Sequence, residues 1–146
     1  MADDLTGLPN LVAGDVIAPL SQCEIVEYEA EAAITKGQAV YLSSDGKISP
    51  ATSAQMSIGI AIMSALVGAM CSVIKRGPVK VEAGGVIAAG QRVYAGDASA
   101  RVLALADQDV NESGSATYTI YYSRAFARAE QTTDEAGDLI IINVGG

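Results

Sequence analysis

The sequence contains no histidine and no tryptophan, and it has only one phenylalanine and two cysteines. Without histidine the chain can form neither a Ser-His-Asp triad nor a Cys-His pair, and no zinc site with imidazole ligands. An enzyme built from this chain would have to rely on carboxylates, Lys, Tyr or Ser, and these residues form no recognisable catalytic cluster. We therefore expect no catalytic residues, no cofactor and no enzymatic activity.

Basic residues are also scarce, with 9 Lys and Arg against 17 Asp and Glu, and the formal net charge is −8. Binding to nucleic acid needs clustered basic residues, so we expect no nucleic-acid partner. The charge is unevenly distributed: residues 1–31 hold seven acids and no base, residues 32–101 seven bases and three acids, and residues 102–146 seven acids and two bases. This asymmetry is typical of complementary surfaces in an oligomer or on a partner, although a solvated acidic protein can also show it.

The two cysteines, Cys23 and Cys71, have neither CxxC spacing nor further thiol ligands, so we expect no metal site. Cys71 lies in an apolar run, and we expect it to be buried. The sequence alone does not decide whether the two cysteines form a disulfide.

A long stretch between Lys47 and Lys75 carries no charge, and residues 56–74 have the length and hydropathy of a transmembrane helix. Two glycines and many β-branched residues in this stretch favour strands instead. The first ten residues hold two Asp and no Lys or Arg, which is not typical of a secretory signal.

A short pattern occurs twice in the chain. Ile, Gly, Gln, Val and Tyr of residues 34–41 recur in residues 87–94 at a constant offset of 53, and residues 68–77 resemble residues 137–146 at an offset of 69. The second copy of the uncharged stretch, residues 122–144, contains both Arg and acidic residues and cannot span a bilayer. We therefore predict that residues 56–74 form a strand, a turn and a strand in a protein core, and that the protein has no membrane partner.

Short alternating segments separated by Gly and Pro predict an all-β fold, a compact antiparallel β-sandwich or barrel with an internal quasi-repeat and an extended N-terminal arm. The chain length fits one domain. We assign residues 1–22 to the arm and residues 23–146 to a single β domain, with repeat units at about 34–77 and 87–146.

Two side-chain patterns point to surfaces. Glu27, Glu29 and Glu31 share one face of a predicted strand, where they could line a cation site or act as an acid–base pair, but a solvated or interface face explains them more simply. Arg124, Phe126 and Arg128 would share one face of another strand. Arg and aromatic residues are favoured at protein interfaces, so we predict a subunit interface there, with a solvated edge as the alternative.

The order of motifs resembles the small capsid decoration, or cement, proteins of tailed bacteriophages and related viruses. The resemblance is clearest over residues 24–97. It rests on Gly-Gln-x-Val-Tyr at 37–41, Asp-Gly-Lys-Ile at 45–48, Ile-Gly-Ile-Ala at 58–61, Gly68, and the strand-like residues 73–77.

This resemblance implies a β-fold that binds the outside of the capsid as a homotrimer and clamps major capsid protein subunits against the pressure of packaged DNA. The expected location is the outer surface of a virion assembled in the host cytoplasm. In such proteins an N-terminal arm often contributes to the capsid contact, although the arm of this chain lies outside the shared pattern. The apolar residues that would make the contact here are Leu5, Leu8, Leu11, Val12, Ile17 and Leu20.

Two other classes of function remain open. The first is a carbohydrate-binding or adhesive β-module on a virion or cell surface, which usually presents Trp or Tyr platforms. This chain has no Trp and six Tyr, of which Tyr41 and Tyr94 occupy repeat positions that we expect to be core. The second is an enzyme such as a carboxylate-based hydrolase.

Overall fold

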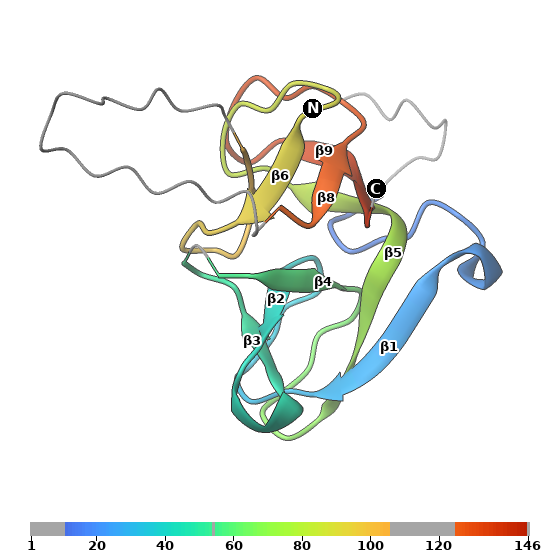
Figure 1. Ribbon diagram of the computed structural model, residues 1–146, viewed down its shortest axis with the longest axis vertical. Coiled ribbons are helices and arrows are strands. Elements are labelled where there is room, and N and C mark those ends of the chain that lie inside the picture. Colours follow the sequence, from blue (N-terminus) through green and yellow to red (C-terminus); the bar gives the residue numbers. More distant parts are fainter. Residues whose placement is uncertain (1–10, 54, 106–124, 146) are drawn as a thin grey trace, which may run out of the picture.

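The computed structural model describes residues 11–53, 55–105 and 125–145 (Figure 1). No helix in these ranges is long and apolar enough to cross a membrane. Their regular structure comprises two short 3-10 turns, η1 (Leu20–Gln22) and η2 (Ser44–Gly46), and the strands β1 (Glu24–Glu29), β2 (Ala39–Leu42), β3 (Ile48–Pro50), β4 (Ser57–Ala61), β5 (Met70–Glu82), β6 (Arg92–Ala95), β7 (Val102–Ala104), β8 (Ala127–Ala129) and β9 (Leu139–Val144).

The strands form one hydrogen-bonded path in the order β3-β2-β4-β5-β9-β8-β6-β7, and β1 pairs with β5 beside this path. Every pairing between these named strands is antiparallel. The prediction of an all-β antiparallel fold is confirmed. Residues 56–74 form strand, turn and strand as predicted, since they contain β4, its connection and the start of β5.

The 13-residue strand β5 joins the two halves of the molecule. Its first part pairs with β1 and β4 in the lower half of Figure 1, and its second part pairs with β9 in the upper half. The change of partner falls at Gly77, whose φ of +128° favours glycine. A Cβ at this position would lie 2.7 Å from the sulfur of Cys23, so the Cys23 side chain would have to shift to admit one.

The Gly-Gln pair of the sequence repeat makes the same hydrogen bonds in both halves. The side-chain oxygen of Gln38 accepts from the amide of Thr35 at 2.9 Å, and that of Gln91 accepts from the amide of Ala88 at 2.8 Å. The preceding glycine amides donate to the carbonyls of Ala61 and Ala129, at 2.8 and 2.7 Å. The repeated residues therefore close two equivalent turns.

Buried side chains form two clusters. The larger one combines both halves and includes Ile60, Ile74, Val93 and Ile140. The smaller one lies within the first half and includes Cys71, which is fully buried as predicted. Burial raises the pKa of the Cys71 thiol, and Cys71 and Cys23 are both free rather than disulfide-bonded.

Candidate functional site

The described part of the N-terminal arm docks on the protein's own β5. The amides of Gly14 and Ile17 donate to the carbonyls of Lys80 and Pro78, at 2.6 and 3.1 Å, and the amide of Lys80 donates back to the carbonyl of Asp15 at 2.9 Å. Val16 pairs with Val79 and packs against the larger core cluster. This segment therefore covers an edge of β5 that would otherwise be unpaired.

Two glycines allow the arm to lie against the first repeat turn. Gly14 and Gly37 both have positive φ, +93° and +95°. A Cβ on Gly14 would lie 2.8 Å from the amide nitrogen of Gly37, and a Cβ on Gly37 would lie 2.9 Å from the carbonyl carbon of Ala13. Backbone approaches backbone here because neither glycine carries a side chain.

An ion pair completes the docking: the Lys36 ammonium lies 2.6 Å from the Asp15 carboxylate. The hydrogen bond from Lys36 and then the Val12 amide hold the pKa of Asp15 below its usual range. Because the folded pKa lies below the unfolded value of about 3.9, this stabilisation is complete above that value and is lost as the pH falls through the folded pKa.

We expect Asp15→Asn to reduce the hydrogen-exchange protection of the Gly14 and Ile17 amides at pH 7. The wild type and the variant should converge as the pH falls through the lowered folded pKa of Asp15 and its carboxyl becomes protonated. Native-state exchange, expressed as protection factors at each pH, measures this difference. A difference that does not shrink as the pH is lowered would show that the charge of Asp15 does not hold the arm.

The six apolar arm residues that we predict to contact a capsid are differently placed. Leu5 and Leu8 lie outside the described residues. Val12 and Leu20 are exposed, at 52% and 62%. Leu11 and Ile17 are half-buried.

The structure describes two of the three residues predicted at a subunit interface, Phe126 and Arg128. Arg124 lies outside the described residues, Arg128 is exposed on β8, and Phe126 is buried in the larger core cluster. Phe126 precedes β8, whose core-facing residues are Ala127 and Ala129, so Phe126 and Arg128 do not present a shared exposed face. A subunit interface at these residues stays a prediction.

Two of the three acids predicted on one strand face, Glu29 and Glu31, have partners within the chain. Glu29 forms an ion pair with Lys47 at 2.9 Å, Glu31 accepts a hydrogen bond from the Ser43 hydroxyl, and Glu27 is exposed. Among the described residues, no three His, Cys, Asp or Glu side chains are grouped so that they could hold a metal ion.

A shallow depression of about 220 Å³ lies between the arm and the two halves, and Lys36, Glu82 and Arg101 line it. Its cations already have partners: Lys36 pairs with Asp15, and Arg101 pairs with Glu82 at 3.1 Å and with Asp97 at 2.7 Å. The Arg101 guanidinium also holds the pKa of Asp97 below its usual range. The depression is therefore a structural junction in which each cation has a carboxylate partner.

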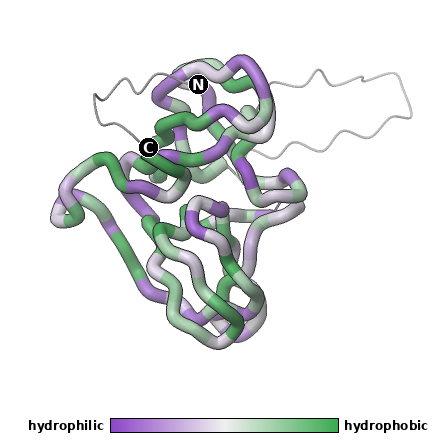
Figure 2. Tube along the Cα trace, turned by 180° about the vertical axis from the view of Figure 1, so that it is seen from behind, coloured by the Kyte–Doolittle hydropathy of each residue, from purple (hydrophilic) through white to green (hydrophobic). Residues whose placement is uncertain are grey.

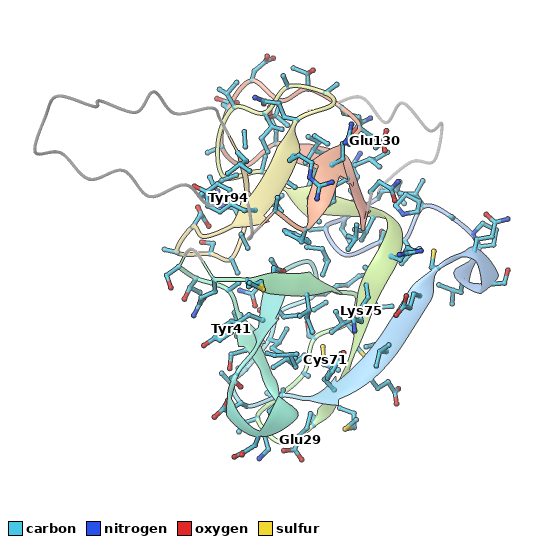
Figure 3. All side chains as sticks on the ribbon, in the orientation of Figure 1. Glu29, Tyr41, Cys71, Lys75, Tyr94 and Glu130 are labelled. Carbon is cyan, nitrogen blue, oxygen red and sulfur yellow. The ribbon has the colours of Figure 1, made fainter. Side chains whose placement is uncertain are left out.

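Described tyrosines form no open platform. Tyr41 and Tyr94, which we expected in the core, are half-buried (Figure 3). The Lys75 ammonium lies 5.7 Å from the centre of the Tyr28 ring, a cation–π contact that covers its face.

Sequence reasoning missed a group of exposed apolar side chains on the connection from β4 to β5 and at the start of β5. This apolar tip, as we define it, comprises Met63, Leu66, Val67 and Met70, which are 42%, 78%, 68% and 51% exposed. In Figure 2 hydrophobic residues reach this lower end of the molecule. The signal was present in the repeat, because at the offset of 69 Leu66 and Val67 align with Glu135 and Ala136.

Comparison with known protein families identifies the family of this chain. A family model described as phage cement protein matches residues 21–141. The chain belongs to the phage cement protein family. The resemblance noted in the sequence is thereby confirmed, and this family is one of structural proteins of phage capsids.

A solved structure supports the fold of this cement protein. The chain is similar to the N base of head fiber gp8.5 in bacteriophage phi29, with a TM-score of 0.59 and 16% sequence identity. The match covers 84% of this chain and 94% of that chain. A comparison with curated protein sequences found no match.

Proposed function

We propose that the protein binds the outer surface of a phage capsid as a homotrimer and stabilises the shell against the pressure of packaged DNA. The observation that carries this proposal is the match to the phage cement protein family over residues 21–141. The partners would be the major capsid protein and two further copies of the chain. The location would be the outer face of the virion, assembled in the host cytoplasm.

The described surfaces support a binding role. The cations of the depression are paired internally, and the described acidic residues form no metal cluster. In contrast, four of the nine large apolar side chains exposed among the described residues belong to the apolar tip, where a partner surface could cover them. A trimer that engages several capsid subunits gains effective concentration, so each individual contact can be weak.

The direct test adds the purified protein to expanded, undecorated capsids of the phage that encodes it and images where density appears. We expect trimeric density on the outer surface, trimers in analytical ultracentrifugation, and greater heat resistance of decorated particles. A protein that stays monomeric and ignores capsids would contradict the proposal. Binding to polysaccharides but not to capsids would favour a carbohydrate-binding module.

The predicted arm contact has its own test. Removing residues 2–10 should weaken capsid attachment, because it deletes Leu5 and Leu8, while the segment that docks on β5 is retained. Thermal unfolding should remain cooperative and near the wild-type midpoint. Unchanged attachment would remove Leu5 and Leu8 from the capsid contact.

A further inference from the structure

Two equivalent turns lie at opposite ends of the molecule (Figure 1). At the lower end the amide of Gly68 donates to the carbonyl of Ala30 at 2.8 Å, and at the upper end the amide of Gly137 donates to the carbonyl of Ala83 at 2.8 Å. Both glycines have positive φ, +85° and +94°. Both turns are therefore closed by the same type of backbone hydrogen bond, donated by a glycine with positive φ.

The side chains on these turns are opposite in character. The lower turn exposes Leu66 and Val67, whereas the upper turn exposes Glu135 and Ala136 at the matching positions. Since the upper turn forms with Glu and Ala, closing the lower turn does not require Leu and Val. Their exposure is therefore not explained by folding.

The lower turn is held rigidly. Ile34 and Ala65 exchange two backbone hydrogen bonds of 2.9 Å on one side of it. On the other side the amide of Ala30 donates to the carbonyl of Ala69 at 2.9 Å, and Glu29 pairs with Met70 in the β1–β5 register. A turn fixed in this way loses little conformational entropy when its side chains are buried by a partner.

The size of the tip distinguishes between two possible partners, a second copy of this chain and a capsid shell. Four side chains make a contact much smaller than the roughly 20–30 residues and about 800 Å² that each partner of a stable pair of proteins contributes. The tip alone is therefore too small to hold two copies of this chain together. It suits a small contact that is repeated on a shell and strengthened by multivalency.

The surroundings of the tip indicate what the partner must present. Residues 48–74 carry no charge; on the neighbouring segment Glu29 forms an ion pair with Lys47, and the exposed Glu31 accepts a hydrogen bond from the Ser43 hydroxyl. Figure 3 shows Glu29 at this end of the molecule. An apolar centre with a charged, internally paired rim fits an apolar depression rather than a charged surface.

We propose that the apolar tip is a capsid-binding site and inserts into an apolar depression on the capsid shell. This inference rests on the proposed function and assigns it to particular residues of the first half. The charged upper turn would then point away from that contact, because the two turns lie at opposite ends.

The double variant Leu66→Glu, Val67→Ala tests this by giving the lower turn the residues of the upper one. We expect its affinity for undecorated capsids to fall roughly 30-fold or more, since two apolar side chains no longer enter the depression. Thermal unfolding and oligomeric state should match the wild type. Val86→Glu, at an exposed position that is 67% accessible, is the matched control and should bind normally.

The outcomes are distinguishable from failure of the proposed function. If the wild type binds capsids and the double variant binds equally well, the tip is not the contact and only this inference is overturned. If the double variant changes oligomeric state, the tip is an interface between copies and the inference is likewise wrong. If the wild type itself ignores capsids, the proposed function has failed, and the tip proposal fails with it.

Discussion

Replacing Gly59 by alanine is expected to lower the free energy of unfolding by about 3 kcal/mol or more. Gly59 lies in β4, and a Cβ there would come closer than 3.0 Å to the carbonyl oxygen of Ile74 on β5. The obstacle is strand backbone, which cannot rotate away as a flexible side chain can. Chemical denaturation monitored by circular dichroism measures the loss.

Gly85→Ala is the matched control, because no atom lies within 4 Å of a Cβ at Gly85 and its φ is not in the left-handed region. This variant should unfold within about 0.5 kcal/mol of the wild type. Equal stabilities for the two variants would show that β4 and β5 do not approach as closely as the structure has them.

Thr133→Val is expected to cost about 2 kcal/mol, although valine has nearly the shape of threonine. The Thr133 hydroxyl is buried; it accepts from the amide of Ile87 at 2.9 Å and donates to the carbonyl of Gly85 at 2.9 Å. Removing the hydroxyl leaves the amide of a fully buried residue without its acceptor. Equilibrium unfolding again measures the effect.

The neighbouring Thr132→Val is the control. Its hydroxyl accepts from the amide of Ala89 at 3.0 Å, but this bond is exposed and water can replace it. We expect a loss below about 0.5 kcal/mol. A loss at Thr132 as large as that at Thr133 would show that burial of the hydroxyl is not the source of the cost.

The repeat was the most informative part of the sequence. Its Gly and Gln positions correspond to real turns because a positive φ and a side-chain acceptor for a turn amide are local requirements, which only a few residue types meet. The same logic assigned the long uncharged stretch to strands, since its second copy carries charges. The sequence therefore predicted these local turns directly.

Phe126 shows where the period-two reading failed. Alternation placed it on the same face as Arg128, but β8 contains only Ala127–Ala129, and Phe126 lies before it. A side chain just outside a strand follows the path of its connection, not the strand's alternation. Its burial among residues of both halves depends on contacts far away in the sequence.

The pairing of charges also depends on contacts that the sequence does not show. Sequence asymmetry suggested that the acidic residues 1–31 meet a partner or another copy. Two of the ion pairs join this segment to the basic middle within one chain, Asp15 with Lys36 and Glu29 with Lys47, and a partner for the other acids stays a prediction. Only the folded arrangement of the arm, β1 and the turns brings these charges together.

The amino-acid sequence by itself determined the all-β class, the duplicated turns and the absence of histidine chemistry, because these depend on residue type and local spacing. Tertiary structure decided which apolar residues are left over after the core is filled. Leu66 and Val67 read as part of a hydrophobic run, yet the turn closed by Gly68 carries them outward, while Ile60 and Ile74 on either side turn inward. Burial is a property of the packed sheet, and the placement of β4 and β5 is what leaves the side chains of the apolar tip at the surface.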